Sequence, residues 1–141
     1  MADIVFEDNS MKVKTAISER IDAVLEECAG ELESQVKRNQ DMYRYTGQTT
    51  SSWRHRVIGS ALAEHYEAII GSSEENAIWE EHGTGEYALN GNGRKGGWSY
   101  EDETGVWHRT NGKAPRRHFW NAYNKLKSKL INRIQNSLKG L

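Results

Sequence analysis

The sequence predicts an α+β fold in which a small antiparallel sheet of two hairpins packs against two long amphipathic helices. Three observations lead to this fold class. Apolar residues recur at helical spacing near both ends of the chain, short alternating segments flank turn signals in the middle, and glycines punctuate the region between them. The 141 residues are expected to form a single domain, 1–141, with a short helix and a long glycine-rich loop between the main elements.

The first long helix is predicted from Met11 to about Asn39, with Ser10 as its N-cap. Its apolar residues step by three and four along one stripe, which consists of Val13, Ile17, Ile21, Val24, Cys28, Leu32 and Val36. Cys28 is the only cysteine of the chain. We therefore expect it to be a small buried apolar residue in a protein that folds in a reducing cytoplasm.

The first hairpin is predicted after this helix. Trp53 to Ile58 alternates in the manner of a strand, and Gly59-Ser60 is typical of a turn. A second strand follows up to Ile70, although a helix over Ala61–Ala68 is an alternative for this segment. We favour the hairpin.

A short helix is expected next, because acidic residues at 74 and 75 suit a first helical turn and Gly83 ends the helix after about two turns. Trp79 is expected to be a buried anchor of this helix, since it is a large apolar residue in an acidic segment. Eight glycines then lie between Gly83 and Gly112, and residues 83–97 are predicted to be a flexible loop.

The second hairpin is predicted from Trp98–Glu101 and Val106–Arg109, joined by an acidic tip at 102–105. Pro115 is a suitable boundary before the final helix. The apolar stripe of that helix consists of Phe119, Tyr123, Leu126, Leu130, Ile134 and Leu138. Neither long helix can bury its stripe alone.

The charge is divided unevenly along the chain, although the net charge is only −1. Residues 1–90 contain 17 acidic and 8 basic residues, whereas residues 91–141 contain 3 acidic and 11 basic residues. This division suits head-to-tail stacking of subunits, or a basic surface that faces a polyanion. A basic helix that is merely solvated is the alternative. The hydrophobic content of 36% is low for a globular domain and also fits a core shared within an oligomer.

No motif predicts catalysis, a metal or a cofactor. The five histidines lack partners at metal-ligand spacing, and a single cysteine excludes a thiolate zinc site. The string Gly91-x-Gly93-x-x-Gly96 fits a dinucleotide fingerprint, but no predicted strand precedes it and no helix follows. No membrane span or signal peptide is expected, because no apolar run is long enough and the first nine residues lack a basic region.

A nucleic-acid-binding role is the main alternative to a structural one. Aromatic and basic side chains alternate around the second hairpin, namely Trp98, Tyr100 and Trp107 with Arg94, Lys95, Arg109 and Lys113. Such a combination can stack bases beside neutralised phosphates. Aromatic residues on a short hairpin more often pack against a core or a neighbouring subunit.

Three short motifs, taken in order, resemble a family of long-tailed bacteriophage proteins, the gene-product-ten-like or minor tail protein Z-like group. The first motif is carried by Thr46, Gly47, Ser52 and Trp53, the second by Ala77, Trp79, Glu81, Gly83 and Thr84, and the third by Pro115, Phe119 and Ala122. The resemblance covers about residues 10–140. Thr49, Glu80, His82, His118 and Asn121 depart from the residues usual in that family.

The resemblance implies a structural virion protein that forms a ring, commonly six-fold, at the head-proximal end of the tail and around the DNA channel. Its neighbours would be head-completion, tail-terminator or tail-tube proteins, with the chain made in the bacterial host cytoplasm. The candidate interface or DNA-channel residues are Arg94, Lys95, Arg109, Arg116, Arg117, Lys125, Lys127 and Lys129. The alternative function is a small nucleic-acid-binding protein or ribonuclease-like toxin that uses the basic residues and tryptophans.

Overall fold

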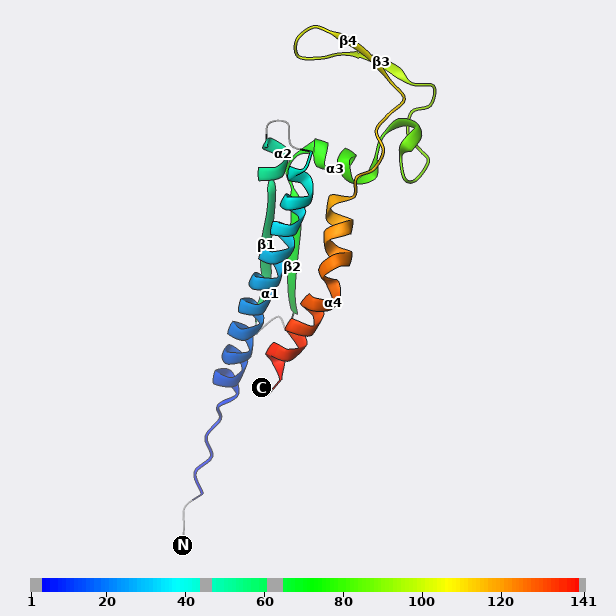
Figure 1. Ribbon diagram of the computed structural model, residues 1–141. Helices are drawn as coiled ribbons and strands as arrows, with labels where there is room; N and C mark the ends of the chain where they lie inside the picture. Colours follow the sequence, from blue (N-terminus) through cyan, green and yellow to red (C-terminus); the bar gives the residue numbers. More distant parts are fainter. Residues whose placement is uncertain (1–3, 44–46, 61–64, 140–141) are drawn as a thin grey trace.

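The computed structural model describes residues 4–43, 47–60 and 65–139, and its mixed helix and strand content confirms the predicted α+β class. The elements in chain order are α1 (Ser10–Asp41), α2 (Gln48–Ser51), β1 (Trp53–Ser60), β2 (His65–Ser72), α3 (Glu75–His82), the 3-10 turn η1 (Gly85–Tyr87), β3 (Trp98–Glu101), β4 (Trp107–Thr110) and α4 (His118–Leu138). Figure 1 shows α1, α4 and the β1–β2 hairpin side by side, with the β3–β4 hairpin projecting beyond one end of this body.

The core lies where α1 and α4 pack antiparallel. Asn39 near the end of α1 donates to the His118 carbonyl at the start of α4 (2.9 Å), and Arg20 reaches the Ser137 carbonyl near the end of α4 (3.4 Å). The buried apolar side chains between and around these helices include Val24, Cys28, Leu32, Val36, Ala122, Leu126 and Leu130. The predicted stripes therefore pair with each other, as two amphipathic helices require.

The first turns of α1 extend beyond this pairing. Arg20 already lies opposite the last residues of α4, so the ten residues before it have no α4 turn to contact. Val13 is accordingly exposed, although it belongs to the predicted stripe. Ser10 is not the N-cap that the sequence suggested. It is the first helical residue, and its amide donates to Asp8 Oδ1 (2.9 Å), while Asn9 occupies the cap position.

The β1–β2 hairpin packs against α1. Its register pairs Trp53 with Ser72 and His55 with Ile70, and these pairs face the helix. His55 Nε2 lies 2.5 Å from Glu26 Oε1, and its Nδ1 contacts Glu33, so two α1 carboxylates hold the ring. The predicted turn at Gly59-Ser60 belongs to β1, which runs to Ser60; residues 61–64 lie outside the described ranges.

The two hairpins form separate sheets and not the single sheet that was predicted. Among the described strands, β3 and β4 pair only with each other. Gly96 and Gly97 come directly before β3, and Gly105 lies in the tip between the two strands. Tyr100 and Trp107 remain exposed, because no helix of the described chain covers this hairpin. The tip is ordered by Asp102, whose Oδ1 accepts from the Thr104 and Val106 amides, both at 2.9 Å.

The short helix is present, but the prediction that Trp79 is its buried anchor is wrong. Trp79 is 47% exposed, whereas Ala77 and Glu80 are buried. Ala77 and Glu80 are three residues apart and share one face of α3, and Trp79 lies on a different face. The residues that surround a short helix decide which of its faces is buried. Here Ala77 packs in the apolar core, and Lys113 and Arg116 bind Glu80.

The glycine-rich segment 83–97 adopts a specific path beside residues 110–113. The Glu86 amide donates to the Asn111 carbonyl (2.9 Å), and the Gly96 amide donates to Glu86 Oε1 (3.3 Å). Gly93 lies so close to Gly85 that a side chain at Gly93 would meet the Gly85 carbonyl oxygen at 2.1 Å. The glycines therefore permit close backbone packing, and the predicted flexibility of the loop in solution stays a prediction.

Among the helices of residues 4–43, 47–60 and 65–139, none combines the length and apolar character that crossing a bilayer requires.

Candidate functional site

Residues of the three motifs meet at the start of α4, which we call the junction: residues 77–84 of the α3 region, residues 113–122, and Trp53. Trp53 is buried, stacks on Phe119 with ring centroids 6.1 Å apart, and donates from Nε1 to Gln40 Oε1 (3.0 Å). Ala77 and Ala122 are also buried in the same apolar cluster. Motif residues nearly 70 positions apart thus form one packed unit.

Glu81 caps α4. Its two carboxylate oxygens accept hydrogen bonds from the backbone amides of Phe119 and Trp120, each at 2.9 Å. A helix N-terminus carries partial positive charge and unpaired N–H groups, so a carboxylate in this position stabilises the helix. Arg117 immediately precedes α4 with a φ of 56°, and its Nε lies 3.8 Å from Glu81 Oε1.

Gly83 and Thr84 fix the segment that leads into α4. Gly83 has a φ of 74°, and a side chain there would meet the Lys113 carbonyl oxygen and Pro115 Cδ at 2.9 Å. Glycine is thus required both by conformation and by space. The Thr84 amide donates to the Lys113 carbonyl, and Thr84 Oγ1 accepts from the Lys113 amide, both at 2.9 Å.

Glu80 is the central charged residue of the junction, and sequence reasoning missed it. Its side chain is only 5% exposed and contacts Lys113 Nζ, Arg116 Nη1 (3.2 Å) and His118 Nε2 (3.1 Å). Its backbone carbonyl also accepts from the Arg116 amide at 2.7 Å. A buried carboxylate needs such compensation, because an unpaired charge in the interior is costly. The available signal was the three-residue spacing from Ala77, which puts Glu80 on the inward face.

Burial also shifts the pKa values of two basic side chains that contact Glu80, His118 and Lys113. Burial lowers the pKa of His118, and burial together with the nearby Arg116 guanidinium lowers the pKa of Lys113. Burial thus disfavours the charged form of the His118 ring, whose Nε2 lies 3.1 Å from Glu80 Oε2, while the Arg116 guanidinium supplies positive charge beside the same carboxylate. The Arg116 guanidinium also lies 3.9 Å above the Tyr43 ring, which connects the end of α1 to the cluster.

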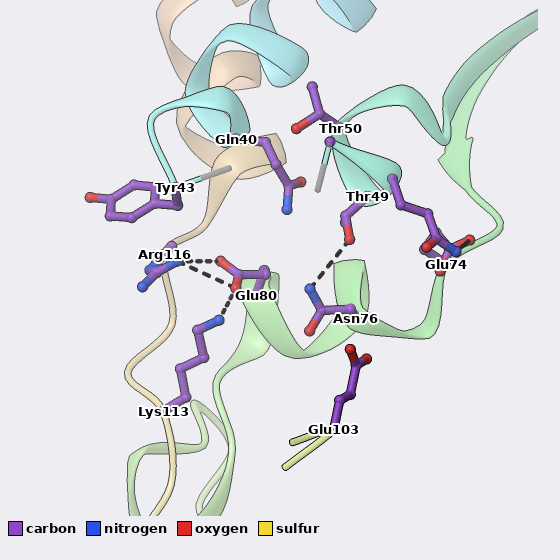
Figure 2. Close-up of a pocket in the computed structure, with 12 residues that line it drawn as sticks. Gln40, Tyr43, Thr49, Thr50, Glu74, Asn76, Glu80, Glu103, Lys113 and Arg116 are labelled. Carbon is purple, nitrogen blue, oxygen red and sulfur yellow. Dashed lines mark hydrogen bonds and ion pairs between the residues drawn. The ribbon is translucent and has the colours of Figure 1, made fainter. Parts of the chain in front are cut away.

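A polar pocket of about 380 Å³ opens beside Glu80. Figure 2 shows Glu80 between Arg116 and Lys113 on one side of it, with Thr49 and Asn76 on another. Glu103, from the tip of the second hairpin, also lines it. Within residues 4–43, 47–60 and 65–139, no group of three or more histidine, cysteine or acidic side chains is arranged to hold a metal. Lys113 and Arg116 both bind Glu80 beside this pocket, and these ion pairs join α3 to the segment that leads into α4.

Gly47 and Ser52 of the first motif lie outside the junction. Thr46 is outside the described residues. Gly47 precedes α2 with a φ of 82°, and Ser52 Oγ lies 2.6 Å from Ser72 Oγ, which ties the start of β1 to the end of β2. Trp79 contributes its carbonyl to the Gly83 amide (2.8 Å) while its ring is half-exposed.

The eight candidate interface or DNA-channel residues do not form one basic surface. The structure distributes them over the glycine-rich segment (Arg94 and Lys95), β4 of the second hairpin (Arg109), the junction (Arg116 and Arg117) and α4 (Lys125, Lys127 and Lys129). Those at the junction bind Glu80 and Glu81, and Lys129 pairs with Glu31 of α1 at 2.7 Å. Part of the charge division along the sequence is therefore neutralised inside the chain.

No protein-family model, curated protein or solved structure matches the chain.

Proposed function

We propose that this chain is a structural virion protein of a long-tailed phage, which forms a six-fold ring at the head-proximal end of the tail and joins the tail to the head around the DNA channel. The single observation that carries the proposal is the junction. Three short motifs, chosen for their order in the sequence, come together there through Trp53, Glu81, Gly83 and Phe119. Their roles are packing, helix capping and chain positioning.

Exposed apolar side chains at both ends of the molecule support an assembly role. Ile4 and Phe6 are 97% and 90% exposed in the N-terminal segment, and Trp107 is 66% exposed on the projecting hairpin. Exposed apolar groups that lie near one another often mark surfaces that bind other proteins. In the proposed ring they contact neighbouring copies or the adjoining head-completion, tail-terminator or tail-tube proteins.

The basic residues give less support to the alternative, a small nucleic-acid-binding protein or ribonuclease-like toxin. Arg116 and Lys129 are engaged by carboxylates of the same chain. Arg94, just before β3, lies over the Trp98 ring, and Arg109 of β4 donates to the Gly96 carbonyl. In the proposed ring, these two residues contact passing DNA without reading its sequence.

The test is deletion of the gene in the phage that encodes the chain, followed by complementation with the wild-type protein. We expect deletion to give filled heads and separate tails in electron micrographs, and complementation to restore joined particles. Antibody labelling should mark the neck, and native mass spectrometry of the extracted chain should give a ring. Normal particles after deletion, or absence of the chain from purified virions, would contradict the proposal. Binding to nucleic acid tighter than the micromolar non-specific range at physiological salt, or cleavage of RNA, would favour the alternative.

A further inference from the structure

An apolar groove of about 350 Å³ lies between the end of β2, α3 and the start of α4. Its apolar lining consists of Trp53, Ile70, Ala77, Ile78, Phe119 and Trp120. Ile78 and Trp120 are strongly exposed although they face this hollow. The groove thus has the size and composition of a site that accepts one or two apolar side chains.

The ionisable residues that line the groove are Glu81, His82 and Arg117. Glu81 is already occupied, since both its oxygens accept amides of α4. Arg117 Nε lies 3.8 Å from Glu81 Oε1 and the guanidinium lies over the Trp120 ring, while the side chain stays 31% exposed and gives one rim of the groove a positive group. An occupant with apolar residues followed by acidic ones would be complementary to it.

The N-terminal segment of the same chain has this chemistry. Ile4, Val5 and Phe6 are three consecutive apolar residues, each at least 87% exposed, and Glu7 and Asp8 follow them directly. The segment is extended and leads away from the body in Figure 1. Three large apolar side chains left in water favour a partner that buries them.

The segment cannot reach the groove of its own chain. Trp53 of the groove donates to Gln40, and Gln40 lies 30 residues along α1 from Ser10, which corresponds to about 45 Å at the rise of an α-helix. Phe6 is four residues from Ser10, and an extended chain of that length spans at most about 14 Å. The apolar segment and the groove therefore lie at opposite ends of α1.

We propose that residues Ile4–Phe6 of one copy dock in the groove of a second copy of this chain, with Glu7 and Asp8 near the Arg117 rim. The contact joins two different surfaces, so it is heterologous and not self-complementary. Heterologous contacts generate closed rings when the rotation between copies closes. This inference rests on the proposed function only in that the contacts close into a ring. The docking between two copies can be tested with the isolated protein.

Cysteine cross-linking tests the docking. The only native cysteine, Cys28, is buried, and burial raises the pKa of its thiol, so it stays unreactive. We expect Phe6→Cys protein mixed with Ile78→Cys protein to form an intermolecular disulfide under mild oxidation, since the bond requires Cα atoms about 4.4–6.8 Å apart. Ile131→Cys is the matched control, because Ile131 is exposed on α4 and does not line the groove.

The double variant Phe6→Cys/Ile78→Cys should give a ladder of cross-linked species that ends at the size of the ring. Deletion of residues 4–6 should abolish the oligomer in native mass spectrometry while circular dichroism stays unchanged. The docking is overturned if the control cross-links equally, if Phe6→Cys pairs mainly with itself, or if Trp107→Cys and not Phe6→Cys cross-links to Ile78→Cys. If the protein is found at the virion neck but the cross-link does not form, only the docking is wrong. If the cross-linked ring forms but the protein is absent from virions, only the proposed function is wrong.

Discussion

The two hairpins of this protein, both predicted from the sequence, have very different surroundings in the structure. β1–β2 lies on α1, where Trp53 is buried and His55 is held by two carboxylates. β3–β4 stands away from the helices and holds itself through the Asp102 tip, with Trp107 exposed. Alternation in a sequence thus predicts that strands will pair, while docking depends on whether another element presents a complementary stripe.

The largest expected difference between the two hairpins is in the loss of stability when one tryptophan of each is replaced by alanine. Trp53→Ala removes a buried ring that stacks on Phe119, and we expect it to lower the free energy of unfolding by about 4 kcal/mol. Trp107→Ala is the matched control, and its exposed ring should change this free energy by less than about 0.5 kcal/mol. Urea denaturation followed by circular dichroism measures both. Equal losses would mean that the second hairpin also contributes to the core.

A second pair compares two acids that line the same pocket. Glu80→Ala leaves Lys113 and Arg116 without their buried partner, so we expect a loss of about 3 kcal/mol in the free energy of unfolding. Glu103→Ala, at the tip of the second hairpin, should stay within about 0.5 kcal/mol of wild type. A small loss for Glu80→Ala, measured by the same denaturation, would show that the junction does not need the buried charge.

The smallest effect is an opposite response of the hairpins to pH. Hydrogen bonds that the His55 ring donates to Glu33 and Glu26 raise the pKa of His55, so its contribution is complete below the ordinary value of 6.5 and is lost as pH rises through the raised pKa. Hydrogen bonds from Thr104 and His108 lower the pKa of Asp102, so its contribution is present above 3.8 and is lost as pH falls.

Variants can isolate these two contributions. The stability difference between wild type and His55→Gln should shrink as pH rises above neutrality, as measured by denaturation at several pH values. Protection of the Thr104 and Val106 amides, which donate to Asp102, should instead fall at acidic pH and be low at every pH in Asp102→Ala, as measured by hydrogen exchange. A common pH trend for both hairpins would contradict this assignment.

The sequence predicted the elements whose evidence is local. The helical stripe through Val24, Cys28 and Leu32 and the glycine stop at Gly83 both correspond to the observed structure. The prediction from the sequence was wrong where residues distant in the chain determine which side chain is buried. Hydrophobicity favoured Trp79 over Glu80 as the inward residue of α3, but Lys113, Arg116 and His118 arrive there from more than 30 positions away and make burial of the acid favourable.

The candidate site shows the same division. The sequence singled out Trp53, Glu81 and Phe119 only as residues of motifs that resemble a family, and the structure shows that they lie together in one packed unit. The basic residues looked like one surface because they are close in sequence. Lys129, however, faces Glu31 across the antiparallel helix pair. Residue spacing within the last 50 residues cannot predict this contact, because Glu31 lies 98 positions earlier in the chain.

The pairing of α1 with α4 also determines when the chain can fold during synthesis. Cys28 and Leu130 touch across 102 positions, so the apolar stripe of α1 leaves the ribosome long before the helix that covers it exists. Contacts of this sequence separation form late and slowly, and exposed stripes attract chaperones or other nascent chains in the interval. A stop codon at the start of α4 would therefore remove the helix that covers the apolar stripe of α1.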